Sequence, residues 1–313
     1  MRASPAPVRS DLDGIDWVQS VPFIVLHLLC FAAFFTEFRW YYPVVMLGSY
    51  FVRMFGVTGV HHRYFSHRTY KTSRWFQFVL AFLAETSTQK GVLWWGAHHR
   101  DHHKHSDDPE DVHSPVQRGF WWSHVGWIMA RRYTGTNTQR IADFAKYPEL
   151  MWLNKYYLVP PIALGVAMFL IGGWPLLLWG YFISTVLLWH GTFTINSLAH
   201  LWGSKRYVNT DESRNNFWLA LITLGEGWHN NHHYYQSSTN QGFFWWEIDI
   251  TYYILKAMSW VGLVWDLRTP PQHVRDAYLE QRQAKANEQM HAAAAAVRGS
   301  TSASPPTTYP LPS

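Results

Sequence analysis

Two copies of the pattern H-x-x-H-H have the clearest chemical content in this sequence. One copy occupies positions 99–103 and the other positions 229–233. On a helix, residues at i, i+3 and i+4 share one face, so each copy directs three imidazoles towards one point. Neutral imidazole is a good ligand for zinc, copper, iron and nickel. The patterns therefore predict six metal ligands: His99, His102, His103, His229, His232 and His233.

Three further histidines have positions that suit the same chemistry. His62 and His67 form H-R-Y-F-S-H, and His200 closes N-S-L-A-H, with Asn196 one helical turn before it. Together these are nine imidazoles. One zinc ion takes about four protein ligands, so nine suit two ions. We interpret the other nine as hydrogen-bonded or surface groups, with two of them flanking the first pattern: His27, His61, His98, His105, His113, His124, His190, His273 and His291.

Four apolar stretches indicate the elements that position these histidines. Each is close to the roughly 20 residues that a helix needs to cross a bilayer. Lys and Arg are abundant between the second and third stretches and almost absent from the connectors within each pair. The positive-inside rule therefore places both termini and the nine histidines on the cytoplasmic side. The expected spans are about 21–38 and 40–60 in a first hairpin, and 157–173 and 174–196 in a second.

The expected fold is all-α and integral to the membrane, with four transmembrane helices in two hairpins and a helical cytoplasmic cap that holds a His-rich di-metal centre. Residues 75–95 are apolar but contain Glu85 and Lys90. Each would cost roughly 3 kcal/mol at mid-bilayer, so we expect a helix pair under the cap. Residues 243–265 suggest an interfacial helix. The expected boundaries are a cytoplasmic segment 1–20, hairpins 21–60 and 157–198, cap parts 61–156 and 199–284, and a disordered tail 285–313.

Composition agrees with membrane contact. Of 313 residues, 18% are aromatic and 15% are charged, whereas an average soluble domain has roughly 25% charged residues. The formal net charge of +5 fits a surface that faces anionic lipid or an anionic substrate, and no basic helix or RNA-binding pattern indicates nucleic acid. The single cysteine, Cys30, excludes a disulfide framework. The polar N-terminal sequence argues against a cleaved signal peptide.

Several stretches resemble the membrane fatty acid desaturases. HRYFSH (62–67), HRDHHKHSD (99–107) and EGWHNNHH (226–233) are similar to the three histidine boxes of that family. NSLAH (196–200) and RGFWWSHVGW (118–127) resemble its acyl-CoA Δ9, or stearoyl-CoA, branch, and the resemblance runs from about Val21 to Val264. It implies that the nine histidines ligate two irons and that Asn196 holds a water beside one iron. It also implies O2-dependent removal of two hydrogens from an acyl chain.

The chemistry makes sense of these ligands. An unactivated methylene C–H has no acidity for a base to exploit, so the reaction needs a redox-active metal centre. The sequence has no G-x-G-x-x-G fingerprint, iron–sulfur spacing or cytochrome b5 motif. We therefore expect a ferredoxin, a flavoprotein reductase or a separate cytochrome b5 to supply electrons. Basic residues on the cap would attract such acidic carriers. Four acids are candidates to accept ring N–H bonds and set the tautomers: Glu226, Asp101, Asp107 and Asp108.

The resemblance also implies where the acyl chain would lie. Tyr50 and Met54 precede His62 by about 3.3 and 2.2 helical turns, where the family's acyl tunnel ends. Two bulky side chains there favour a C16 chain over C18. Three residues match positions that shape the tunnel and its bend: Gln89, Trp95 and Thr192.

The sequence leaves two hypotheses for the head group that carries the acyl chain. Arg131 and Arg132 match a basic pair that would bind CoA phosphates. Animal members of the family often have Arg-Asp before the H-x-x-H-H box, where this chain has Ala97 and His98. Acyl-CoA is the first hypothesis for the substrate, and an acyl-lipid substrate remains open.

Hydroxylation or alkane oxidation is a further alternative for the reaction, because hydroxylases use similar histidine boxes. A metal transporter would need more polar residues in mid-membrane. The expected location is a bacterial inner membrane.

Overall fold

The computed structural model describes residues 13–301, so most of the expected N-terminal segment and the end of the expected tail lie outside the described residues. The chain divides into two compact units after Pro270. The elements of the first unit are α1 Trp17–Cys30, η1 Phe31–Phe35, α2 Tyr41–Phe55, η2 Gly56–Ser66, β1 Lys71–Thr72, α3 Arg74–Glu85, α4 Val92–His105, α5 Pro115–Arg118, η3 Trp122–Gly126, α6 Trp127–Met129, η4 Arg131–Tyr133, α7 Ala142–Ala145, α8 Pro148–Lys155, α9 Val159–Leu176, η5 Leu177–Ile183, α10 Ser184–Ser197, η6 Leu198–His200, α11 Phe217–Ile222, α12 His229–Tyr234, α13 Ile250–Trp260 and β2 Val264–Trp265.

Three helical segments of the described chain are long and apolar enough to cross a membrane: Trp17–Phe35, Tyr41–Ser66 and Val159–His200. The third has 42 residues. Its backbone leaves the helical conformation at Gly172 and Gly173, where φ of Gly173 is +63°. Glycine adopts positive φ at little cost. The break falls in the connector expected from the sequence, and η5, which follows it, packs back against α9.

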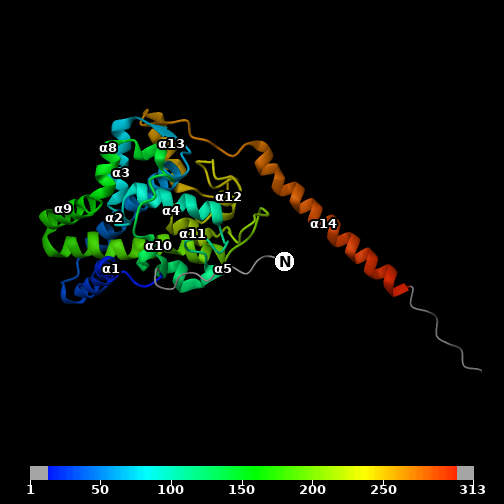
Figure 1. Ribbon diagram of the computed structural model, residues 1–313, viewed down its shortest axis with the longest axis horizontal. Helices are drawn as coiled ribbons and strands as arrows, with labels where there is room; N and C mark the ends of the chain where they lie inside the picture. The colour runs from blue at the N-terminus through cyan, green and yellow to red at the C-terminus, as the bar shows by residue number, and fades with distance from the viewer. Residues whose placement is uncertain (1–12, 302–313) are drawn as a thin grey trace, which may run out of the picture. The chain divides into compact units, whose positions relative to one another are not determined.

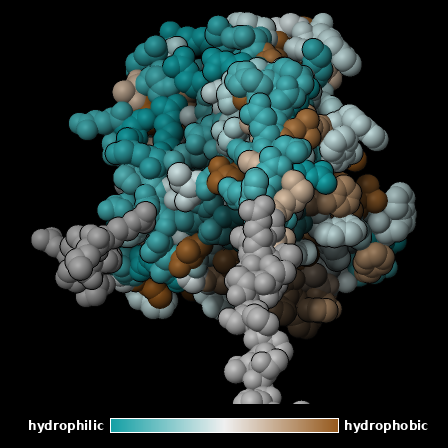
Figure 2. Space-filling view, turned by 90° about the vertical axis from the view of Figure 1, so that its right-hand side faces the viewer, coloured by the Kyte–Doolittle hydropathy of each residue, from teal (hydrophilic) through white to brown (hydrophobic). Residues whose placement is uncertain are grey.

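These segments expose many apolar side chains. Val18, Phe34, Phe35, Leu170 and Ile171 are each at least 76% exposed. A continuous apolar surface of this kind is unfavourable in water and is what lipid-facing helices present. In Figure 1, α1, α2, α9 and α10 lie together at one end of the first unit. The surface seen from the opposite side in Figure 2 is mostly hydrophilic. The first unit thus combines membrane-type helices with a polar cap.

The helix pair expected for residues 75–95 is present as α3 and α4. Ser73 caps α3 by accepting a hydrogen bond from the amide of Phe76. The buried carboxyl of Glu85 ends α3 and accepts from the amide of Val92, the first residue of α4. Burial raises the pKa of Glu85 to about 8, so this carboxyl is mostly neutral at pH 7. Glu85, the acidic residue that argued against a single membrane span, therefore lies where α3 ends and the connection to α4 begins.

Two features differ from the sequence expectation. The helix expected over 243–265 is shorter, because Asp249 caps α13 by accepting from the amide of Tyr252. Trp265 belongs instead to β2, where it pairs with Lys71 of β1 in antiparallel register. In the second unit, α14 runs over Gln272–Thr301, where disorder was expected from residue 285. Alanine has the highest helix propensity, and the Ala-rich run explains the difference.

Candidate metal centre

Four helical elements bring nine histidines together in the cap. η2 continues α2 without a break and ends beside the first pair, while α4 and α12 each present one H-x-x-H-H pattern on one face. The short helix η6 directly follows α10 and ends at His200. The contributors are His62 from η2, His67 just after it, His99, His102 and His103 from α4, His200 from η6, and His229, His232 and His233 from α12.

The nine histidines fall into two groups. Ring nitrogens within each group lie within 4.8 Å of one another. In the first group, neighbouring Nε2 atoms are 2.9 to 3.0 Å apart, and in the second the Nε2 atoms of His200 and His229 are 3.0 Å apart. In each H-x-x-H-H pattern, the two adjacent histidines belong to different groups: His103 and His232 to the first, and His102 and His233 to the second. The first group is His62, His67, His99, His103 and His232, and the second is His102, His200, His229 and His233.

Carboxylates determine which ring nitrogens face inward. In the second group, three rings donate Nδ1–H to a carboxylate: His102 to Asp111 at 2.8 Å, His200 to Asp107 at 2.8 Å and His233 to Asp211 at 2.7 Å. In the first group, His62 donates Nδ1–H to Glu226 at 2.5 Å. A neutral imidazole has one N–H, so each inward Nε2 carries a lone pair. Facing lone pairs about 3 Å apart repel one another unless a cation lies among them.

Burial keeps most of these rings in the form that binds a metal. It lowers the pKa of His99, His103 and His232 far below the ordinary value, and neighbouring imidazoles lower each pKa further. The Nε2 atoms of His102 and His233 are buried and have no hydrogen-bond partner in the described part of the chain. Buried ring nitrogens without a partner, in a set of converging imidazoles, fit bound metal ions.

The acids are charged. Burial raises the pKa of Asp107, but hydrogen bonds from His200 and Ser114 outweigh burial and bring that pKa to about 2. Burial likewise acts against ionisation of Asp111, and the hydrogen bond and electrostatic attraction of His102 outweigh it, so the pKa of Asp111 lies well below its usual range. Each acid can therefore stabilise the Nδ1–H tautomer of its histidine at neutral pH.

The structure brings two of the four candidate acids to the histidines. Glu226 and Asp107 contact imidazoles, whereas Asp101 forms an ion pair with Arg140. Asp101 lies between His99 and His102, so it projects from another side of α4. Asp108 is exposed.

Sequence reasoning missed the other acids. Asp111 follows its histidine by nine residues across a turn, and Asp211 lies in a loop remote from its histidine; helical periodicity detects neither. Arg63 was also missed. It is fully buried and joins Glu226 at 3.1 Å to Asp249 at 2.9 Å. An arginine directly after the first box histidine was the available signal.

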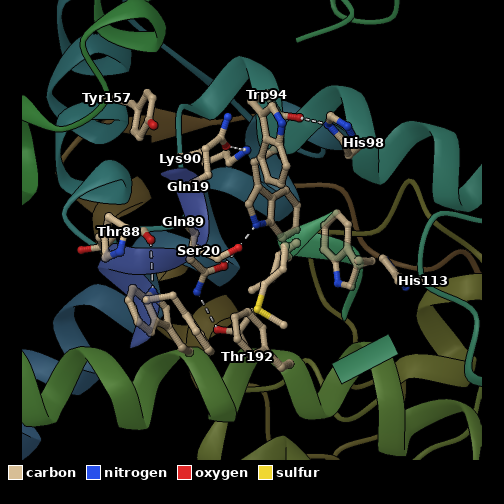
Figure 3. Close-up of a pocket in the computed structure, with 18 of the residues that line it drawn as sticks. Gln19, Ser20, Thr88, Gln89, Lys90, Trp94, His98, His113, Tyr157 and Thr192 are labelled. Atoms are coloured by element: carbon tan, nitrogen blue, oxygen red, sulfur yellow. Dashed lines mark hydrogen bonds between the residues drawn. The ribbon is translucent and has the colours of Figure 1, made fainter. Parts of the chain in front are cut away.

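A mainly apolar cavity of about 350 Å³, the large cavity, adjoins the first group at His99. Figure 3 shows Gln89 and Thr192 meeting across it. Gln89 donates to Thr192 Oγ1 at 3.0 Å and accepts from Trp95 Nε1 at 3.3 Å. The three expected bend residues thus form one hydrogen-bonded set in its wall. Lys90 also lines this cavity and donates to Gln19 Oε1 at 2.7 Å.

A smaller cavity of about 30 Å³, the inner cavity, continues past the bend. It shares Trp95, Thr192 and Asn196 with the large cavity and is also lined by Met54. Tyr50, which the sequence also placed at the tunnel end, lines neither cavity and donates to Ile222 O at 2.8 Å. A Cβ added to Gly191 would lie 2.6 Å from the Tyr50 hydroxyl and 3.1 Å from Met54 Cε. Tyr50 and Met54 therefore pack tightly against α10.

The two arginines expected at the head group are exposed and line neither cavity. Arg132 lies 3.5 Å from Asp13, which also pairs with Arg118 at 3.0 Å. His113, which was interpreted as an ordinary histidine, lines both cavities, with its ring centroid 4.2 Å from that of His102.

The other histidines lie outside the two metal groups. His27 and His190 join α1 to α10, with their Nε2 atoms 3.0 Å apart, as expected for polar groups within membrane helices. His98 donates Nδ1–H to Trp94 O at 2.9 Å, the bond drawn in Figure 3. These contacts agree with interpreting the three rings as hydrogen-bonded groups.

Comparison with known proteins gives a consistent result. A family model described as fatty acid desaturase matches residues 39–259. The chain is 34% identical over 277 residues to an sn-2 palmitoyl-lipid 9-desaturase of Nostoc, covering 85% of this chain and 95% of the relative. It is 36% identical over 265 residues to an sn-1 stearoyl-lipid 9-desaturase of Synechocystis, covering 82% and 81%. It is 33% identical over 282 residues to an acyl-CoA C20 Delta5-desaturase of Anemone leveillei, covering 86% and 90%.

Proposed function

This chain belongs to the fatty acid desaturase family, and we propose that it uses two irons and O2 to insert a cis double bond at Δ9 of a saturated acyl chain carried by a membrane lipid. The observation that carries the proposal is the pair of inward-facing imidazole groups beside a mainly apolar cavity. Oxidation of an unactivated C–H bond needs a redox-active metal centre next to an apolar space for the chain.

The proposed ligands are the nine histidines, and Asn196, which lines both cavities, would hold a water beside one of the irons. When bound, the irons would activate O2 so that two hydrogens leave the acyl chain, while two electrons and two protons come from outside and two waters form. The carboxylates of Glu226, Asp107, Asp111 and Asp211 orient the rings towards the ions. Zinc alone would not supply this redox chemistry.

The cavity residues would select the carbons that react. An acyl chain in the large cavity must turn where Gln89, Trp95 and Thr192 meet, next to His99. Their two hydrogen bonds hold the wall of the bend, and the surrounding apolar side chains exclude water. Met54 and Tyr50 would stop the methyl end and favour C16 over C18. Positioning of this kind supplies selectivity without a chemical step.

Two features favour an acyl-lipid over an acyl-CoA. Val18 and Leu158 line the large cavity and are 84% and 49% exposed, at or beside the ends of apolar helices. Such an opening suits a chain that enters from lipid. Arg132 and Arg118 are paired with Asp13, which leaves fewer cations for CoA phosphates. The lipid 9-desaturase names of the Nostoc and Synechocystis relatives point the same way. Acyl-CoA remains the second candidate, because Arg131 is exposed and basic.

The proposed topology is four transmembrane helices in two hairpins, with the termini and the metal centre in the cytoplasm. The break at Gly172–Gly173 supports two spans within Val159–His200, and the distribution of cations supports the orientation. An external carrier, a ferredoxin, a flavoprotein reductase or a cytochrome b5, would deliver electrons to the cap.

The test is expression in a desaturase-deficient host, followed by gas chromatography of fatty acids with location of the double bond. We expect 16:1 Δ9 in the membrane lipids and iron close to two per chain in the purified protein. In vitro, palmitoyl-phospholipid vesicles should be desaturated faster than palmitoyl-CoA. A hydroxylated product would overturn the reaction, zinc without iron would overturn the metal centre, and the reverse substrate preference would overturn the lipid assignment.

A further inference from the structure

A third cavity, the polar cavity, lies against the metal groups. Its volume is about 220 Å³, and its lining differs from that of the large cavity. It consists of charged, hydroxyl, amide and imidazole groups, among them His103, Ser106, Asp108, Thr210, Asp211 and His233. No residue of the large cavity lines it. The cap therefore has separate apolar and polar spaces beside the histidines.

The polar cavity touches both groups at once. His103 belongs to the first group and His233 to the second, and both line the cavity. Nδ1 of His103 and Nε2 of His233 are buried without a hydrogen-bond partner in the described chain. Asp211, which accepts from Nδ1 of His233 at 2.7 Å, is a third wall group. An ion inside this cavity would be next to ligands of either group.

The outer wall of the polar cavity suits a hydrated divalent cation. Asp108 and Thr210 are exposed, and Ser106 lies deeper, 3.5 Å from Nδ1 of His233 through its hydroxyl. Oxygen groups can replace the waters of an entering ion one at a time, and carboxylates add attraction. Lys104 opposes this charge, but its side chain is exposed and free to extend into solvent.

The large cavity is a poor alternative path for a cation. Its lining is mainly apolar, and it holds Lys90, whose ammonium is paired with the neutral Gln19 carbonyl. Burial lowers the pKa of Lys90 to about 8, so it stays mostly protonated at pH 7. A divalent ion would have to lose its water beside a fixed positive charge, which is costly. An acyl chain would also occupy the same space.

We propose that the polar cavity is the route by which divalent metal ions reach and leave the two histidine groups, with Asp108 at its outer rim as the first carboxylate that an incoming ion meets. The proposal rests on the proposed metal centre. It assigns separate paths to the ions and to the acyl chain, so the ions can exchange while the large cavity is filled.

Metal release tests the route directly. Full-length protein is purified in detergent, loaded with Fe2+, and mixed with an excess of a coloured ferrous chelator, and the rate of colour formation is followed anaerobically. Thr210→Trp narrows the polar cavity, and Asp108→Lys reverses the charge at its rim. Val18→Trp is the matched control, because it places the same bulky ring at an exposed position of the large cavity.

We expect Asp108→Lys and Thr210→Trp to slow release on the order of tenfold, the scale on which local charge and access change rates, and Val18→Trp to release iron at the parent rate. Slower release in Val18→Trp alone would assign the ions to the large cavity, and equal rates in all variants would mean that the cap opens more widely; either result overturns the route. A parent protein that binds no iron would overturn the metal centre itself.

Discussion

At the scale of single residues, the environment of each imidazole is more informative than the number of imidazoles. Helical spacing predicted six of the metal-ligating histidines, their position and the family resemblance added three more, and the structure brings these nine into two groups. That was possible because i, i+3, i+4 periodicity is local. The acids that orient the rings come from turns and loops. Asp111 and Asp211 reach the site only through tertiary folding, so no local pattern could identify them, whereas Arg63 had one local signal, its position directly after His62.

Asp111→Asn tests the role of these acids. Asp111 accepts from Nδ1 of His102 at 2.8 Å through Oδ1 and from the amide of Asp107 at 2.8 Å through Oδ2. An amide removes the charge and places a donor against a donor. We expect metal affinity to fall about 10- to 100-fold, measured as iron per chain after challenge with a graded chelator.

The matched control is Asp101→Asn. Asp101 pairs with Arg140 at the surface of the cap, so iron retention should stay at the parent value. Equal loss of iron in both variants would show that general charge, and not the hydrogen bond to His102, retains the metal.

Met54→Ala tests whether the inner cavity limits chain length. Removing this fully buried side chain enlarges the inner cavity, so the 18:1 to 16:1 product ratio should rise about 10-fold or more, by the roughly 1–3 kcal/mol that a pocket boundary contributes to discrimination. Gas chromatography of host lipids measures the ratio. Met46→Ala, also on α2 but outside the lining, should leave the ratio unchanged; an equal rise there would indicate a general packing effect.

At the scale of elements, the positions where helices break determine the arrangement of the helices. Residues 75–95 divide at a buried glutamate, and Val159–His200 divides at two glycines. Both breaks were predictable, because charge and Gly-Gly-x-Pro are strong local signals. The length of α14 was not predicted, because low-complexity composition was interpreted as disorder while its alanines favour a helix.

Gly173→Ala tests the break between α9 and α10. At φ +63° and ψ −155°, this backbone conformation is nearly confined to glycine, while the nearest atom to an added Cβ is 3.9 Å away. The cost is therefore backbone strain of about 1–3 kcal/mol, seen as a lower Tm in detergent. Gly48→Ala has open space in α2 and should keep or raise the Tm. An unchanged Tm for Gly173→Ala would contradict the strained turn.

At the scale of the whole molecule, the exposed apolar helices and the hydrophilic cap define two environments (Figures 1 and 2). The sequence predicted this division from the clustering of apolar residues and cations. It did not predict the cavities, because a cavity is the space left by side chains from helices distant in sequence, such as α1, α4 and α10 in the large cavity.

Cysteine labelling tests the proposed topology. Because Cys30 is the single cysteine, Cys30→Ser gives a background without thiols. In that background, Glu37→Cys lies in the first hairpin connector and Lys146→Cys in the cap, and both positions are exposed. We expect an impermeant maleimide added to spheroplasts to label only Glu37→Cys, and to label Lys146→Cys after the membrane is opened. Labelling of both from outside would contradict the two-hairpin arrangement.

The division of adjacent histidines between the two groups has a consequence for assembly. His102 and His103 share one turn of α4 yet belong to different groups, and His232 and His233 do the same on α12. Fixing either helix for one ion also places ligands for the other. Uptake of iron should then be positively cooperative: during titration, native mass spectrometry should find mainly chains with no iron and chains with two, and few with one.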